Sequence, residues 1–442
     1  MGRVGWALLA GFVLAAAAVG NIYLSLDEGG VRIAGRTLLN IRVWQAAFFA
    51  GGIGYLLLLA SFRTRPVTGR AVLLAAVVLR IPLLFCQPNN DCSRYIWEGR
   101  VQNLGFNPYV AGPNDPRLEP YRDDVWASVN KKHYTTIYPP LAEMEFRLCS
   151  AVAYHVRTPQ ILHTLLDVAV LLALARLLAA LGRPAWYLAI YALSPLTLAA
   201  FAHAGHNDTL MLLALIGFVA AARSQRWRLA GPLLGLAILA KTVPAILLGL
   251  LLRRSRVACV LALLTVVAGY LFYADAGWML VDTLRAFPSE SHFNNLPDEL
   301  RHLANKTFGN ILLARGRFTI VLGILAGAAI LRTIRPRDIV TDTRWLIAVV
   351  VLALPIIHFW YLTWPLALIA LDPRGYRAWL VLALTFVFYW QAEASWLGGG
   401  RWQLDLGTVC LIWIPFIAAW IAEAVWERRK RRRTSAVETQ VA

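Results

Sequence analysis

The sequence predicts an all-α integral membrane protein, a polytopic helical bundle. Of its 442 residues, 59% are hydrophobic and only 15% are charged. A soluble protein of this length has no core large enough to bury so much apolar surface. Apolar stretches also recur along nearly the whole chain, and many approach the roughly 20 residues that a spanning helix needs. Length therefore predicts a number of spans here, not a number of soluble domains.

The apolar stretches divide the chain into candidate spans. The first resembles a signal sequence, but we expect it to be retained as a helix because it is long and a second span follows soon after. We assign residues 1–426 to one transmembrane domain and residues 427–442 to a basic tail. The stretches lie near residues 5–24, 42–62, 70–86, 160–180, 185–202, 207–222, 229–252, 257–274, 309–332, 345–371, 376–392 and 405–426.

Arginine-rich junctions between the stretches predict the orientation of the chain. The 43 Lys and Arg residues outnumber the 25 Asp and Glu residues, which gives a formal net charge of +18. Short basic loops are typical of the cytoplasmic side, where they face anionic lipids. We therefore expect a cytoplasmic tail, contacts with membrane lipids and no binding to nucleic acid. The junctions contain Arg63, Arg65, Arg70, Arg183, Arg223, Arg226, Arg228, Arg253, Arg254, Arg256, Arg332, Arg335, Arg337, Arg344, Arg374 and Arg377.

Two longer segments are predicted to lie on the opposite, non-cytoplasmic side. The first is an outer loop, residues 87–158, in which positive and negative charges nearly balance. Within it, residues 139–157 are expected to form a helix that lies on the membrane surface. The acidic and basic side chains of that helix support this orientation; they are Glu143, Glu145 and Arg147. The second outer loop, residues 275–308, carries a mixed set of cations: Arg285, His292, Arg301, His302 and Lys306.

Two apolar stretches are predicted to break near their centres. Stretch 229–252 contains Lys241 and Pro244 and forms either two half-helices or a re-entrant hairpin. Broken helices with ionisable side chains are tolerated where they line a wet or protein-enclosed cavity. Lys241 is therefore a candidate site residue; the alternative is a lysine that only packs or reaches toward the headgroups. Stretch 345–371 is interrupted by Pro355, His358, Trp364 and Pro365. The alternative for His358 is an ordinary interfacial histidine.

A polar helix is predicted over residues 91–104, directly after the third span. An asparagine or Asp91 can cap its start, and Gly105 can end it. Asp91, Arg94 and Glu98 then form one stripe, with spacings of three and seven residues. The carboxylate of Asp91 can accept a proton from a hydroxyl group, and Arg94 can hold a phosphate with two hydrogen bonds. The alternative is a simple helix cap followed by a common surface ion pair.

Other side chains are candidates for contacts with a sugar, a phosphate or a metal. Aromatic and cationic residues lie within the predicted helix 91–104 and in the residues that follow it, although an interfacial aromatic belt explains the aromatic residues equally well. His203, His206 and Asp208 have some features of a metal site, but no clear third histidine accompanies them, so no metal is expected. Of the five cysteines, Cys92 and Cys149 either pair or, as we expect, stay free. The aromatic and cationic group comprises Tyr95, Trp97, Trp126, Lys131, Lys132, His133, Tyr134 and Tyr138.

Several of these motifs occur together in one known family. They are Asn90-Asp91-x-x-Arg94-Tyr95-x-Trp97-Glu98-Gly99-Arg100, Gly105-x-Asn107-Pro108-Tyr109, Ile137-Tyr138-Pro139-Pro140-Leu141, His206-Asn207-Asp208 and Lys241-x-x-Pro244. Between residues 70 and 371 the chain resembles the bacterial GT-C glycosyltransferases that use polyprenyl-phosphate sugars. It is most similar to their polyprenol-phosphate-mannose-dependent mannosyltransferase branch.

The resemblance implies a GT-C fold, a bundle of about 11–14 transmembrane helices with further helices on the membrane surface. In this fold an acid in an early outer loop catalyses an inverting transfer. Asp91 matches this acid and is the expected general base. The family often has a second acid just before it, where this chain has Asn90, so a metal-independent, single-base reaction is expected. His358, in Pro355-x-x-His358-Phe-Trp-Tyr, matches a histidine near the active site. The resemblance also implies a bacterial inner membrane and a periplasmic active site.

The predicted function is therefore transfer of a sugar, with mannose expected, from a polyprenyl-phosphate donor to a hydroxyl of a glycan, glycolipid or protein, without a cofactor. Two alternatives remain: a transferase for another lipid-linked sugar, such as a pentose or aminoarabinose, and a lipid or solute transporter. The expected phosphate-binding residues are Arg94, Lys241 and His358. The expected sugar- or acceptor-binding residues are Tyr95, Trp97, Glu98, His133, Tyr138, His206, Asn207 and Asp208.

Overall fold

A computed structural model describes residues 34–280, 282, 293–296, 299, 317–397 and 401–441. Within these ranges the chain contains helices but no strand, and Phe293 and Ile356 form an isolated parallel bridge. Most of the second outer loop and the first apolar stretch lie outside the described residues. The α-helices are α2 (Ala34–Thr64), α3 (Gly69–Arg80), α4 (Asp91–Asn103), α5 (Asp124–Ser128), α6 (Pro140–Val152), α7 (Arg157–Ala180), α8 (Leu188–Ala192), α9 (Pro195–Thr197), α10 (Asp208–Arg223), α11 (Trp227–Ala240), α12 (Leu248–Arg254), α13 (Arg256–Leu271), α16 (Arg317–Ile334), α17 (Ile339–Ala353), α18 (Thr363–Leu371), α19 (Tyr376–Thr385), α20 (Gln391–Leu397) and α21 (Leu406–Val441).

The fold is the predicted all-α polytopic membrane architecture. Three helices in the described ranges are long and apolar enough to cross a membrane: Trp44–Thr64, Arg157–Ala180 and Leu406–Arg429. A fourth candidate is the pair Ala185–Ala192 and Pro195–His203, which bends by 48°. Several other apolar stretches consist of shorter helices, so helix length alone does not give the total number of spans. Large apolar side chains are exposed along α13 and α21, where lipid would cover them.

Both predicted breaks occur. Helix α11 ends where Lys241 adopts an extended backbone, and a short 3₁₀-helix, Val243–Leu247, then begins with a proline in its first turn. Helix α17 ends at Ala353, and extended residues lead to a second 3₁₀-helix, Phe359–Leu362. Trp364 and Pro365 were expected to interrupt this stretch, but they lie in the first turn of α18, where a proline costs no hydrogen bond.

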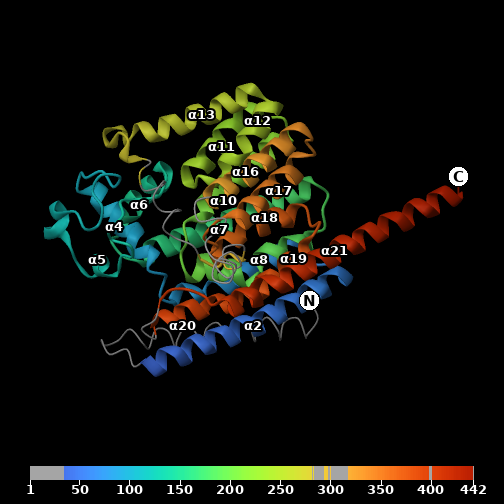
Figure 1. The fold of residues 1–442 in the computed structure, drawn as a ribbon, viewed down its shortest axis with the longest axis horizontal. Helices are drawn as coiled ribbons and strands as arrows, with labels where there is room; N and C mark the ends of the chain where they lie inside the picture. Colours follow the sequence, from blue (N-terminus) through green and yellow to red (C-terminus); the bar gives the residue numbers. More distant parts are fainter. Residues whose placement is uncertain are drawn as a thin grey trace, which may run out of the picture.

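Helices α4, α5 and α6 form a lobe at one end of the molecule, and the C-terminal part of α21 projects from the other end (Figure 1). The lobe has a small core of its own around Trp97 and Leu118. Helices α4 and α6 cross closely at Gly99, where any Cβ would lie 2.0 Å from the carbonyl oxygen of Phe146. A side chain larger than hydrogen at Gly99 would therefore separate the two helices.

Helix α6 covers residues 140–152 of the helix predicted over residues 139–157, but only one of the three charged side chains that supported its surface position is exposed. Glu143 and Glu145 are buried inside the protein and do not face water. Glu143 accepts hydrogen bonds from Gln102, and Glu145 lies 3.0 Å from the Nε2 atom of His163. The exposed face of α6 instead combines Arg147 with apolar side chains that include Leu148 and Val152.

Candidate active site

The candidate site lies where four non-adjacent segments meet: the start of α4, the turn between residues 203 and 208, the break at Lys241 and the break before α18. The turn is held against α4 at Gly205, whose backbone has a φ of +73°. A Cβ at this position would lie 2.7 Å from the Sγ atom of Cys92. Glycine therefore permits both the left-handed turn and the close approach, and these bring His206 to Asp91.

Asp91 is the partly exposed carboxylate of the site. Its Oδ1 atom accepts a hydrogen bond of 2.7 Å from the side-chain amide of Asn130. Its Oδ2 atom lies 3.5 Å from Nδ1 of His206, and the side chain is 18% exposed. Burial raises the pKa of Asp91 above its usual value, while the bond from Asn130 and the charges of Arg94 and Lys241 oppose that rise.

Trp360 packs against two histidines of the site. The ring of His206 stacks on Trp360 with 3.6 Å between centroids, and the ring of His358 stacks on the same side chain at 4.2 Å. The Nδ1 atom of His358 lies 2.8 Å from the Tyr389 hydroxyl. Two predicted histidines therefore share one aromatic partner within the site.

Lys241 is positioned by an ion pair and by two aromatic faces. Its Nζ atom lies 2.6 Å from Oδ1 of Asp208, which also accepts a hydrogen bond of 2.7 Å from the Trp364 indole. The ammonium lies 4.8 Å from the ring centroid of Tyr361 and 5.0 Å from that of Trp364. The Lys241 side chain is 19% exposed, whereas its partner Asp208 is 1% exposed.

Two buried polar atoms of the site have no hydrogen-bond partner in the described part of the chain. They are Nε2 of His206 and Oδ2 of Asp208. Unpaired buried polar atoms are costly, and they are found where a ligand or water completes them. These atoms are consistent with the predicted contacts of both residues with a sugar or an acceptor.

The structure places Arg94 in the protein interior, where it does not face the open site. The guanidinium forms an ion pair of 2.9 Å with Glu98, and both side chains are at most 5% exposed. Its remaining N–H groups donate to backbone carbonyls of residues 130–135. The predicted contacts of Arg94 with phosphate and of Glu98 with a sugar would require this packing to open.

The other residues predicted to bind a sugar or an acceptor are mostly buried. Trp97 and Tyr95 are both buried; Trp97 lies in the core of the lobe and Tyr95 stacks on Phe146, so neither presents a ring to a sugar. Tyr138 packs against the ring of Tyr95, and Asn207 accepts a hydrogen bond from the Tyr95 hydroxyl. Only His133 is exposed, and its ring lies beside that of Tyr134.

Sequence reasoning missed Asn130 and Trp360. Asn130 lies before the lysine pair 131–132, far from any recognised motif, so no signal in one sequence connects it to Asp91. Trp360 stands inside the motif that identified His358, and its aromatic character was the available signal. Nothing in the spacing indicated that it would contact His206, 154 positions earlier.

No three His, Cys, Asp or Glu side chains gather closely enough to hold a metal ion in the described ranges. The ring of His203 packs against Trp44, while His206 stacks on Trp360. All five cysteines, including Cys92 and Cys149, are free thiols.

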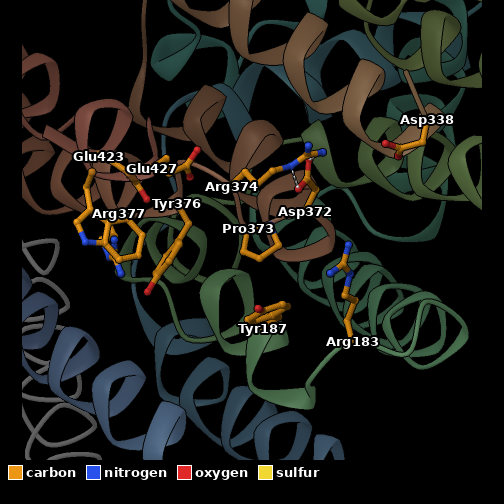
Figure 2. A pocket seen from close by; sticks show the side chains of 11 residues that line it. Arg183, Tyr187, Asp338, Asp372, Pro373, Arg374, Tyr376, Arg377, Glu423 and Glu427 are labelled. Carbon is orange, nitrogen blue, oxygen red and sulfur yellow. Dashed lines mark hydrogen bonds and ion pairs between the residues drawn. The ribbon is translucent and has the colours of Figure 1, made fainter. Parts of the chain in front are cut away.

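A pocket of about 550 Å³ is lined by charged and aromatic side chains, among them Arg183, Tyr187 and Asp372 (Figure 2). It lies beside Asp372, which follows α18, whereas Trp364 at the start of α18 contacts the candidate site. Arg344 and Arg374 form ion pairs with Asp372. This pocket is therefore separate from the candidate site, and its charged groups largely neutralise one another.

Comparison with known proteins identifies one family. The MptA_B family, described as alpha-(1->6)-mannopyranosyltransferase, N-terminal domain, matches residues 1–284. The match includes the start of α4, the His206 turn and the break at Lys241. No curated protein and no solved structure matches the chain.

Proposed function

The chain belongs to the MptA_B family of α-(1→6)-mannopyranosyltransferases, and from this premise we propose that it transfers mannose from a polyprenyl-phosphate donor to a hydroxyl acceptor. The proposed reaction takes place at the non-cytoplasmic face of a bacterial inner membrane. The acceptor is a glycan, a glycolipid or a protein. Its new linkage is proposed to be α-(1→6), as in the family description.

Asp91 is proposed as the general base. The acceptor oxygen bonds to the anomeric carbon while its proton passes to Asp91, and the bond from that carbon to the phosphate oxygen breaks. The observation that carries this proposal is the partly exposed Asp91 carboxylate, which Asn130 orients through one oxygen while the other faces the site. The leaving polyprenyl phosphate is already anionic and needs no proton.

Inversion fixes the configuration of the proposed donor. A single displacement at the anomeric carbon exchanges its configuration, so an α-linked product requires a β-linked mannosyl phosphate. Of the three residues expected to hold this phosphate, Lys241 and His358 lie beside the site, whereas Arg94 is bound by protein carbonyls. Lys241 is the better candidate because a partly exposed ammonium can stabilise the phosphate charge that develops in the transition state.

Replacement of Asp91 tests the proposed base. Asp91→Asn should abolish release of polyprenyl phosphate from polyprenyl-phosphate mannose, while the protein remains folded in the membrane. Asp124→Asn is the matched control because this carboxylate of the lobe is exposed on α5 and makes none of the side-chain contacts described for the site. Full transfer by Asp91→Asn would contradict the assignment.

A donor panel tests the proposed sugar and the absence of a cofactor. Mannose should be accepted in preference to a lipid-linked pentose or aminoarabinose, and a better rate with either of those would transfer the proposal to that sugar. We expect activity to survive a metal chelator because Asn90 occupies the place of a second acid. Loss of activity with chelator, restored by a divalent cation, would contradict metal independence.

A further inference from the structure

We propose that Asn130 positions the Asp91 carboxylate and that Arg94 acts through Asn130, by holding the backbone of residues 130–135 in place. This inference rests on the proposed role of Asp91 as base. It gives Arg94 a function different from the predicted contact with the donor phosphate.

The guanidinium of Arg94 uses all its donor groups within the protein. Nε pairs with Glu98. One terminal nitrogen donates to the carbonyls of Asn130 and Lys131, at 3.0 and 3.4 Å, and the other to those of Tyr134 and Thr135, at 3.2 and 3.1 Å. A planar guanidinium with five donors can bind two pairs of carbonyls and one carboxylate at once, which an ammonium cannot do.

The segment bound by Arg94 contains an unfavourable backbone conformation at Lys131. Lys131 has a φ of +43°, in the left-handed region that non-glycine residues rarely occupy. Such a conformation costs free energy and persists where surrounding contacts impose it. Here the contacts come from Arg94, which binds the carbonyls on both sides of the strained position. The turn places the Asn130 amide on Asp91.

The hydrogen-bond network extends beyond Arg94 to two other helices. Thr136, the next residue after the bound carbonyls, donates to Glu143 of α6 at 2.5 Å. Gln102 donates to the other oxygen of Glu143 at 2.8 Å and accepts a hydrogen bond from Tyr273, beyond the end of α13. The segment around Asn130 is therefore fixed to α4, α6 and the α13 end. Buried networks of this kind restrict motion when their polar groups are satisfied.

The bond from Asn130 has two consequences for a base. It leaves Oδ2 of Asp91 as the oxygen available to an acceptor hydroxyl. It also stabilises the ionised carboxylate, which lowers the pKa of Asp91 against the effect of burial. Without Asn130, the carboxylate would stay protonated to a higher pH and would rotate more freely.

The test is the pH dependence of kcat for Asn130→Ala in the full-length protein, with Asn114→Ala as the control. Asn114 is an exposed asparagine of the same lobe. We expect Asn130→Ala to lower kcat by about tenfold or more and to move its acid limb up by about one pH unit, with little change in the KM for donor. A loss of kcat with an unmoved acid limb would overturn the positioning role, because a purely structural defect lowers activity at all pH values.

Arg94→Lys tests the second step. It should shift the acid limb in the same direction, and adding it to Asn130→Ala should cause little further loss, because both changes act through one hydrogen bond. A raised donor KM with an unmoved limb would assign Arg94 to the phosphate and overturn the proposal. If Arg94→Lys does not fold, the Asn130 profile alone decides. An active Asp91→Asn variant would instead refute the proposed base, so the two failures are distinguishable.

Discussion

Asp208 forms a buried ion pair with Lys241, the residue proposed to bind the donor phosphate. Its carboxylate is 1% exposed and pairs with the 19% exposed Lys241, while Trp364 donates to the same oxygen. Removing the cation from a buried pair leaves an uncompensated charge, which costs more than the pair contributes. Effects of Lys241 on catalysis and on folding are therefore expected to appear together in a single substitution.

Lys241→Met should slow transfer and lower the free energy of unfolding by on the order of 3 kcal/mol. The double substitution Lys241→Met with Asp208→Asn should regain most of the stability, because no buried charge is left alone, but it should not regain transfer. Denaturation in detergent and donor turnover measure the two quantities. Recovery of both in the double variant would show that Lys241 serves only to neutralise Asp208.

The raised pKa of Asp91 predicts opposite effects on activity and stability. Transfer should fall as the pH falls through this raised pKa, because the base is then protonated. The folded state binds the proton more tightly than the unfolded state, so ionisation of Asp91 destabilises the fold as the pH rises.

Asp91→Asn should therefore match or exceed the wild-type thermal stability at neutral pH, and its advantage should shrink on acidification. Unfolding temperatures of both proteins across the pH range check this. If Asp91→Asn were less stable than the wild type at neutral pH and equally stable in acid, ionised Asp91 would stabilise the fold, which contradicts the prediction.

At the level of elements, local sequence predicted the helices and their breaks but not their contacts. The helix predicted over residues 91–104 is α4, which ends just before Gly105. The interruptions at Lys241 and before His358 follow from prolines and ionisable residues in apolar stretches. The contacts of Asn130 with Asp91 and of Trp360 with His206 join residues 39 and 154 positions apart, so local pattern contains no information about them. The burial of Arg94 was missed for the same reason, because the segment that surrounds it follows by some forty residues.

The turn at Gly205 offers a test of how closely the elements must approach. Gly205→Ala should destabilise the protein by about 1–2 kcal/mol through backbone strain, with more from the contact with Cys92, and should reduce transfer by moving His206. Gly182→Ala is the matched control, since Gly182 also has a positive φ, +61°, but a Cβ there meets nothing within 4 Å.

The comparison separates strain from contact. Both variants should lose stability, but only Gly205→Ala should lose activity at a temperature where both remain folded. Adding Cys92→Ala should restore part of the loss by making room for the new methyl group. Equal activity losses in the two glycine variants would show that the close approach at Gly205 is unimportant.

For the whole molecule, the charge pattern and the position of the site give one consistent orientation. Arg157, at the start of α7, binds carbonyls that precede the outer loop, and Arg183, just beyond its end, lines the pocket at the other end. Helix α7 has 24 residues and is about 36 Å long, enough to cross the apolar layer. The candidate site and the basic junctions at Arg183 and Arg374 thus lie at opposite ends of the bundle. Helix α21 continues as one helix into the basic tail.

Single cysteines at Asn114 and Arg429 should therefore react with a membrane-impermeant thiol reagent from opposite sides of the membrane. Both positions are exposed, whereas four native cysteines are buried; the half-buried fifth, Cys410, is changed to serine in the background. In sealed right-side-out vesicles the outer position should react before lysis and Arg429→Cys only afterwards. Labelling of both positions before lysis would place the lobe and the tail on one side. It would contradict both the positive-inside assignment and a periplasmic site facing away from the tail.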